Sequence, residues 1–415
     1  MDIIIDQSGY SLMTNNFGTF NPGGAPKTWP ITENVIWDLH RPENKLIAAN
    51  KEVIMGMPNR GSTQESFLAM MTMRVLYPFL FNDQVKTKDG QQALLNLARS
   101  HADYRDTLDY CRAIGRGVAT WRPTSFQTKG LWYVNGVLDE GDLRHSSKVG
   151  NWMRMEDYRV NNKASKHYGE HLTLFDDNGK LLCTDTIRRW FDVPHYIFYL
   201  FDPVADVDLN TGDFRGARNG GLSDWYLYRL AEAYLLRAEA KFYINPSDPT
   251  IAEDLNIIRR RAKCEQLYSG TVTIGDIMNE RARELYWEEW RNVELTRVSL
   301  CLARSGRPDE WGNVYKLETF DKQSGTDPDG GSYWYQRINH YGMYNKGPIS
   351  IAASGNANPN YTMDKKNIYW PIPNREITAN NKGTLSQNYG YSGYDPTTPK
   401  WDKWEDAVAD EDRID

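Results

Sequence analysis

A short stretch in the first half of the chain has the spacing of a zinc-peptidase site. Residues His167 to His171 read H-Y-G-E-H, the inverted H-x-x-E-H pattern in which two histidines bind zinc and the glutamate activates water. That chemistry requires both imidazoles on one face of a helix and a third protein ligand. Because Gly169 lies inside the motif and turn-like sequences flank it, the sequence favours a turn over a metal site. A secreted zinc-dependent hydrolase that uses His167, Glu170 and His171 is the enzymatic alternative.

A second stretch resembles a calcium-binding loop. Residues 206–213 read D-V-D-L-N-T-G-D and place oxygen ligands at alternating positions. Thr211 stands where an EF-hand loop requires glycine, and Ala217 stands where it requires glutamate. The sequence therefore favours a solvated turn over a structural calcium ion, and we expect no cofactor.

Glutamates near residue 288 could be imagined as the acid and the nucleophile of a glycosidase. The pairs are Glu284 with Glu288, and Glu288 with Glu289. Arginines 281, 283 and 291 lie within helical reach of them, so intrahelical ion pairs explain these carboxylates better. We expect no catalytic residue in this chain.

Aromatic residues make up 13% of the chain, with 14 Trp and 25 Tyr, and they point to two roles. Tryptophans on expected helices or inside longer motifs are expected to pack in the core: Trp225, Trp287, Trp290 and Trp370. Aromatic rings in polar loops rich in Gly and Pro can instead stack on the apolar face of a sugar, while neighbouring polar groups bond its hydroxyls. The candidate ligand-binding residues are Trp121 with Arg122, Trp132 with Tyr133, and Trp29.

The bulk composition excludes several other classes of function. The net charge of -6 gives no broad attraction to nucleic acid, and no uninterrupted apolar run is long enough to span a membrane. The four cysteines are far apart in sequence, so they indicate neither a metal site nor a dense disulfide framework. The start of the chain shows no signal peptide.

The texture of the sequence changes near residue 221. Residues 1–220 are irregular, with expected helices only near 66–79 and 90–98. From Asp224 the apolar spacing predicts a helix to about residue 244, a second over 251–262 and a third over 274–297. One helical pair and a following helix are fewer than a stable solenoid needs, so we expect the packing partners to be missing from the chain or supplied by something else.

Three stretches, in this order, resemble the C-terminal half of the SusD/RagB family. They are "YRLAEAYLLRAEA" followed by "AEDLNIIRRRA", then "ERARELYWEEWRNVELTR", then "YWPIPNREITANNKGTLSQNYGY" with its P-I-P-x-x-E-I and Q-N-x-G-Y elements. One departure is Glu288-Glu289 where the family pattern has Glu-Gly. The last stretch is expected to be structural, since its prolines fix extended backbone and Asn388 and Gly390 suit a turn.

The resemblance implies a mostly α-helical fold with TPR-type repeats and an irregular, loop-rich region with a few short strands. We expect residues 1–220 to form the loop-rich region with the ligand-binding face, 221–300 the helical segment and 301–415 the C-terminal region, all in one compact unit. The family's signal peptide, lipid-bearing cysteine and first repeats would precede residue 8, so we expect this chain to lack its N-terminal part.

The implied function is noncatalytic capture of a glycan or oligosaccharide at the outer-membrane surface. The implied protein partner is a SusC-type TonB-dependent transporter, within a polysaccharide-utilisation and nutrient-uptake system. Membrane contact would come only through a lipid anchor that is not in this chain, as in a surface-exposed lipoprotein. A scaffold that binds only protein is the third interpretation.

Overall fold

The computed structural model describes residues 1–20, 29–59, 79, 81, 83–95, 108, 110, 117, 122–197, 223–321, 331–351, 355–381, 383–400, 403 and 405–406. The chain forms two compact units, each considered by itself below. Unit 1 comprises Met1–Arg291, Asp309–Gly312 and Arg337–Asn360, and unit 2 comprises Asn292–Pro308, Asn313–Gln336 and Tyr361–Asp415. The predicted boundaries at residues 220 and 300 stay a prediction.

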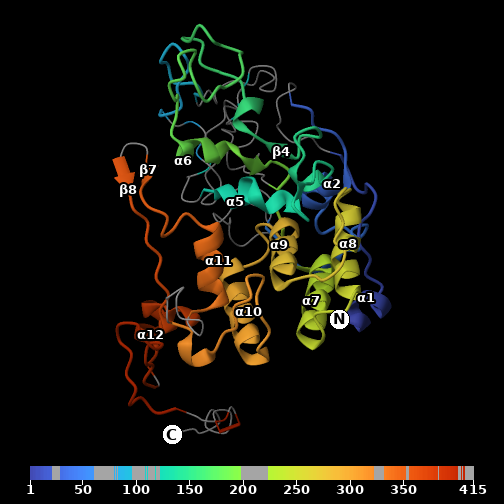
Figure 1. The fold of residues 1–415 in the computed structure, drawn as a ribbon, viewed down its shortest axis with the longest axis vertical. Coiled ribbons are helices and arrows are strands. Elements are labelled where there is room, and N and C mark those ends of the chain that lie inside the picture. The colour runs from blue at the N-terminus through green and yellow to red at the C-terminus, as the bar shows by residue number, and fades with distance from the viewer. Residues whose placement is uncertain are drawn as a thin grey trace. The chain divides into compact units, whose positions relative to one another are not determined.

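Helices predominate over strands in the described residues, so the prediction of a mostly helical fold is confirmed (Figure 1). The helices of unit 1 are α1 (Asp2–Gln7), α2 (Val35–His40), α5 (Ser125–Thr128), α6 (Asp185–Arg188), α7 (Leu230–Ile244), α8 (Thr250–Arg261) and α9 (Ile274–Glu284). Its 3-10 turns are η1 (Gly130–Trp132), η2 (Leu143–His145), η3 (Met155–Asp157) and η4 (Arg189–Phe191).

Helices α7, α8 and α9 form the regular part of unit 1, with α7 packed against both of the others (Figure 1). Helix α8 buries Ile251, Leu255 and Ile258, the apolar positions that predicted it from sequence. Helix α9 begins at a capping box in which Thr273 and Asp276 satisfy each other's backbone N–H groups. The predicted second helix and the observed one differ by a single residue at each end.

Two of the sequence-predicted helices are wrong in extent. Residues 225–229 form strand β6 (Trp225–Arg229) rather than the first turns of α7, because they pair with β1 (Val53–Met57). The predicted helix over 274–297 is broken, since Trp287 has a left-handed backbone with φ of 66° between α9 and α10 (Arg291–Ser305). Residues 90–95 contain no helix, and most of the predicted helix near 66–79 lies outside the described residues.

The strands in the described residues form four antiparallel pairs. The long pair is β1 with β6, and three short hairpins or bridges accompany it: β2 (Tyr133–Val134) with β3 (Val137–Leu138), β4 (Trp152–Met153) with β5 (Val193–Pro194), and β7 (Ile349–Ile351) with β8 (Gly355–Ala357). None of these pairs buries a face large enough to stabilise itself. The loop-rich part of unit 1 must therefore be held by side chains.

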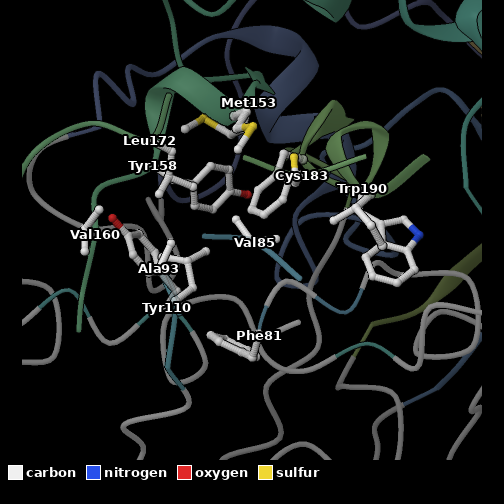
Figure 2. Close-up of a cluster of buried hydrophobic side chains, with 14 of the residues drawn as sticks. Phe81, Val85, Ala93, Tyr110, Met153, Tyr158, Val160, Leu172, Cys183 and Trp190 are labelled. Atoms are coloured by element: carbon white, nitrogen blue, oxygen red, sulfur yellow. The ribbon is translucent and has the colours of Figure 1, made fainter. Parts of the chain in front are cut away.

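A cluster of buried aromatic and sulfur-containing side chains stabilises the loop-rich part of unit 1. Figure 2 shows Tyr158 at its centre, next to Met153, Leu172 and Cys183. Tyr158 makes edge contacts with Phe191 and Trp29, at ring centroid distances of 5.4 and 5.3 Å. Such aromatic pairs bury a large area per residue, which lets segments without regular structure form a core.

A buried ionic network also stabilises this part by joining the loops to the helices. Arg229 donates to Glu52 at 2.6 Å and to Glu284 at 2.5 Å, and Arg261 pairs with the same two carboxylates. Burial alone would raise the pKa of Glu284, but the guanidiniums of Arg261, Arg229 and Arg144 lower it to about 2. The network therefore holds this glutamate ionised in the interior.

The network continues into the loop before η2. Arg144 donates to Asp142, Glu280 and Glu284 at 2.8, 2.8 and 2.9 Å. Arg259 bridges Glu280 and Asp139 at 2.9 and 2.6 Å. These pairs correct the sequence interpretation of the glutamates, because most of their partners lie on other elements rather than on the same helix.

Unit 2 contains α10, most of which lies in this unit, the start of α11 (Tyr333–Tyr341), η5 (Leu317–Thr319), η6 (Lys365–Ile368) and α12 (Asn374–Ala379). Its "WPIP" segment is held by the "QNYGY" segment. The Gln387 amide accepts from the backbone N–H of Ile372 and donates to its carbonyl, at 2.7 and 2.8 Å, and Asn388 donates to the Trp370 carbonyl at 2.6 Å. These hydrogen bonds support the structural role that was expected for this stretch.

Gly390 is required in that segment by its backbone. Its φ is +80°, and a Cβ at this position would lie 2.6 Å from the Cβ of Lys366. Tyr391 completes the arrangement by donating its hydroxyl to the Tyr369 carbonyl at 2.8 Å.

Two of the four tryptophans that we expected in the core are exposed. Trp290 is 67% exposed in the break after α9, and Trp370 is 55% exposed in the "WPIP" segment. Trp225 and Trp287 pack partly buried against the aromatic cluster, as expected. We expected Trp290 to pack because it lay within the predicted helix over 274–297. That helix is interrupted between α9 and α10, where Trp290 lies.

Candidate functional site

The structure separates the sequence-predicted ligand-binding residues into surface and interior positions. Arg122 and Tyr133 are exposed, whereas Trp29 and Trp132 are buried. Trp121 lies outside the described residues. No ring contact, ion pair or hydrogen bond joins the four described residues to one another, so each is considered by itself.

Trp132 is an interior residue. It ends the short turn η1, its indole N–H donates to the Gln127 carbonyl at 2.8 Å, and its ring stacks on His145 with centroids 4.4 Å apart. Burial lowers the pKa of His145 to about 3, so the stacked imidazole is neutral at physiological pH. A ring covered in this way offers no face to a sugar, and we do not propose Trp132 as a ligand contact.

Trp29 is also an interior residue. Its indole N–H donates to the Asp157 carbonyl at 3.0 Å, and its ring stacks on Tyr110 with a centroid distance of 5.7 Å. His195 meets its edge at 4.9 Å. Local composition suggested an exposed loop ring here, but long-range packing against the aromatic cluster buries it, so it is not proposed as a ligand contact.

Tyr133 is 51% exposed on the hairpin made by β2 and β3. The turn between the strands is Asn135-Gly136, both with positive φ, as the twist of a tight hairpin requires. The Asn135 amide donates to the Leu267 carbonyl at 2.9 Å and fixes the hairpin to the segment that follows α8. The next residues of that segment, 268–271, line an open groove of about 480 Å³ beside the first turns of α8.

The groove offers mostly polar groups. Ser247, Ser269 and Thr271 contribute hydroxyls, and Glu253 contributes a carboxylate. An exposed aromatic ring on a fixed hairpin and a hydroxyl-rich groove beside its anchor are groups that can take part in sugar binding.

Arg122 lies on the face of Trp190, with its guanidinium carbon 4.8 Å from the ring centroid. The chain is placed there by Pro123, which favours extended backbone in the residue before it, and by Thr124, whose hydroxyl caps α5. Trp190 belongs to η4, directly after α6, and is itself buried in the aromatic cluster. The guanidinium is therefore held flat against a fixed ring, as in a cation–π pair.

The surroundings of Arg122 are cationic. Its pKa is lowered by partial burial and by the nearby positive charge of Arg189. Strand β7 lies beside α6, the helix that leads into η4 (Figure 1). Sequence reasoning named Arg122 but missed Trp190 and Arg189, because nothing in the local pattern of residues 188–190 indicates which loop they meet.

The H-x-x-E-H motif is a turn and not a helix, as the sequence favoured. His167 Nδ1 lies 2.8 Å from Glu170 Oε2, and His171 Nδ1 donates to the Glu156 carbonyl at 2.6 Å. The two imidazoles are thus held by separate partners, one of them the glutamate that zinc chemistry would need as a base. Within the described residues, no group of three or more His, Cys, Asp or Glu is arranged to hold a metal ion. The calcium-like stretch 206–213 lies outside them.

The glutamates near residue 288 are held by arginines in the interior. Burial raises the pKa of Glu288 to about 7, and Arg229, which donates to it at 2.6 Å, opposes that rise. Its other contact is His40, at 3.2 Å, whose pKa burial lowers well below the usual value. Glu289 pairs with Arg281 and Arg291, at 2.7 and 2.8 Å. This arrangement serves packing, because each carboxylate is occupied by a partner from its own protein.

Comparison with known proteins finds relatives among surface glycan-binding proteins. The chain is 44% identical over 78 residues to the starch-binding protein SusD of Bacteroides thetaiotaomicron, an alignment that covers 19% of this chain and 13% of that protein. None of the described helices combines the length and apolar character needed to cross a bilayer.

Solved structures with a similar arrangement include surface glycan-binding protein A from Bacteroides thetaiotaomicron, with 16% identity, a TM-score of 0.45 and coverage of 94% of this chain and 57% of that one. The same protein in complex with laminarihexaose matches with 16% identity, a TM-score of 0.44 and coverage of 93% and 57%. A SusD superfamily protein from Bacteroides fragilis matches with 15% identity, a TM-score of 0.46 and coverage of 94% and 57%. The chain thus spans little more than half the length of these solved chains.

The family model described as SusD family matches residues 118–391, a range that runs from the loop before α5 to the "QNYGY" segment in unit 2. That range includes all three stretches on which the sequence resemblance rests. The chain belongs to the SusD family.

Proposed function

We propose that this protein captures a glycan or oligosaccharide at the outer-membrane surface without cleaving it. The observation that carries the proposal is the family match over residues 118–391. It is supported by relatives whose names state starch or glycan binding, among them the protein solved with laminarihexaose. The described residues offer the exposed side chains that such binding uses.

The proposed mechanism is the addition of several weak contacts. Tyr133 would stack on the apolar face of one sugar ring, and hydroxyl-rich groups such as those of the groove beside α8 would bond its hydroxyls. Arg122 would contact another part of the glycan, since its guanidinium is exposed on the fixed ring of Trp190. No covalent step is involved, so affinity would grow with the number of sugar units that the surface spans.

The proposed partner is a SusC-type TonB-dependent transporter, to which the glycan would be delivered. The proposed location is the cell surface, with attachment to the outer membrane through a lipid anchor. Both are what family membership implies, and co-purification with a SusC-type transporter of the same organism tests them. Absence of a complex after mild detergent extraction would contradict the delivery step.

Affinity electrophoresis against a panel of starch, laminarin, xyloglucan and acidic polysaccharides tests the capture step. We expect retardation by at least one of them and weaker retardation of Tyr133→Ala and Trp121→Ala. Tyr228→Ala is the matched control for Tyr133→Ala, since Tyr228 is exposed to a similar degree, 55%, on a different strand. If no polysaccharide retards the protein, the protein-only scaffold is the better description.

Metal analysis separates capture from hydrolysis. We expect no stoichiometric zinc in the purified protein and no release of reducing sugar from any glycan that it binds. Stoichiometric zinc that disappears in His167→Ala would support the hydrolase instead.

A further inference from the structure

We propose that the surface formed by Arg122 and Trp190 binds an anionic group, and hence that the captured glycan is acidic, carrying carboxylates or sulfates. This inference rests on the proposed function, because it names the class of glycan that would be captured. The residues that carry it are Arg122, Trp190 and Arg189.

Arg122 has no acceptor of its own among the described residues. Its contact is the ring of Trp190, and no carboxylate, hydroxyl or carbonyl accepts a hydrogen bond from its guanidinium. A guanidinium carries five N–H donors and no acceptor, in a planar fork that matches a carboxylate or sulfate. The ring fixes the plane of the fork and leaves its donors available to a ligand.

Trp190 adds a donor that is also unused. Its side chain is 5% exposed, and its indole Nε1 is buried without a hydrogen-bond partner. Figure 2 shows Trp190 at the edge of the aromatic cluster, with this nitrogen pointing away from the other labelled side chains. A buried N–H without a partner is costly, so a ligand oxygen that accepted from it would gain more than the same contact made in water.

Arg189 adds a second positive charge. It lies close enough to Arg122 for the two charges to repel, and this repulsion is one of the causes that lower the pKa of Arg122. An anionic ligand at Arg122 would relieve this repulsion between the two guanidiniums.

The combination favours an anion over a neutral sugar. A sugar hydroxyl both donates and accepts, whereas the Arg122 guanidinium and the Trp190 N–H can only donate. A carboxylate or sulfate accepts several bonds and also gains from the local positive charge. Since the whole chain carries a net charge of -6, this attraction is local and is not a general affinity for polyanions.

Isothermal titration calorimetry with the full chain tests the proposal. The probes are an oligogalacturonate and a chondroitin sulfate oligosaccharide as acidic ligands, laminarihexaose as a neutral one, and inorganic sulfate as a free anion. We expect at least one acidic oligosaccharide to bind more tightly than the neutral one, with an affinity that falls as salt rises. Binding of inorganic sulfate alone, with no acidic oligosaccharide bound, would overturn the assignment to a glycan.

Three substitutions locate the binding. Arg122→Met keeps an apolar contact with the ring but removes the charge, and we expect roughly a tenfold or greater loss of affinity for the acidic oligosaccharide. Trp190→Phe keeps a ring but removes the N–H, and we expect a smaller loss, on the order of threefold to tenfold. Arg304→Met is the matched control, since Arg304 is an exposed arginine in the last turn of α10 and belongs to neither proposed binding surface.

The outcomes distinguish acidic specificity from glycan capture itself. Binding of laminarihexaose without binding of acidic ligands would overturn the acidic specificity and leave glycan capture standing. Binding of no oligosaccharide would overturn glycan capture itself. Acidic binding that Arg122→Met and Arg304→Met reduce equally would contradict the role of Arg122.

Discussion

Two sets of arginines in unit 1 have opposite surroundings. Arg229 and Arg261 lie in the interior, and each one pairs with two or more carboxylates. Arg122 lies at the surface on an aromatic ring, without a carboxylate partner among the described residues. The first set joins segments of the chain, whereas Arg122 has its donors free.

The comparison teaches that the partners of an arginine, and not its presence in a motif, indicate its role. The described arginines of the family-like stretches pair with carboxylates of the chain, as Arg229 does with Glu52 and Glu284, so their charges are used within the fold. Arg122 belongs to no such stretch. A charge that the fold does not neutralise is available for an external ligand.

The largest expected loss of folding stability comes from replacing one of the arginines that pair with buried carboxylates. In Arg229→Met the buried carboxylates of Glu52 and Glu284 lose a guanidinium, and Glu288 loses the partner at 2.6 Å. Removing one side of a buried ion pair typically costs about 3–5 kcal/mol because the remaining charge has no compensation. Urea denaturation followed by tryptophan fluorescence measures the loss. A loss below about 1 kcal/mol would mean that the network is hydrated and not structural.

The second effect is a pH dependence at Glu288. Its pKa is raised by burial to about 7 in the folded protein, above the ordinary value of 4.5, so its contribution to stability is present below pH 4.5 and is lost as pH rises through 7. Glu288→Gln cannot ionise, so its stability relative to the parent should increase between pH 5 and pH 8. Melting temperatures of both proteins across this range give the answer. A relative decrease would show that Arg229 stabilises the ionised carboxylate more than burial destabilises it.

A third, smaller effect is expected in unit 2, where a neutral side chain does the joining. Gln387→Ala removes both hydrogen bonds to Ile372 and the acceptor for the Asn388 N–H. We expect a loss of about 1–3 kcal/mol, since the backbone groups of a partly buried segment lose their partners. Limited proteolysis with cleavage mapped to the "WPIP" segment measures it locally. Unchanged protection would show that this segment is held by other contacts.

The smallest effect on stability is expected at Arg122. Arg122→Met should change the free energy of unfolding by less than about 0.5 kcal/mol, because an exposed cation–π pair contributes little and methionine keeps the apolar contact. The same denaturation measurement used for Arg229→Met gives a direct ratio between the two arginines. A loss as large as that of Arg229→Met would make Arg122 a structural residue and would erase the contrast between the sets.

Sequence reasoning predicted the parts of the fold that depend on local periodicity. Helix α8 was predicted within one residue because its apolar spacing and its ends are written in consecutive residues. Strand β6 was missed because the aromatic run at 225–229 fits a helix or a strand, and its pairing with β1 decides the outcome. The break at Trp287 depends on the left-handed backbone conformation of one residue, which no sequence pattern predicts.

The candidate site was less predictable for the same reason. Trp29 and Trp132 are in loops of polar composition yet are buried by contacts with distant residues, such as the 128-residue separation between Trp29 and Asp157. Trp290 and Trp370 were expected in the core and are exposed. Burial is set by the three-dimensional packing, so composition around a tryptophan indicates its exposure poorly.

The ionic network also sets an order of events during synthesis. Arg261 and Glu52 are 209 residues apart in sequence, and Arg144 and Glu280 are 136 apart. At translation rates of about 5–20 residues per second, Glu52 would wait on the order of 10–40 s for Arg261 to be made. The first half of the nascent chain must therefore keep its acidic groups hydrated until α8 and α9 arrive, and contacts of such high sequence separation favour slow, late and cooperative closure of the fold.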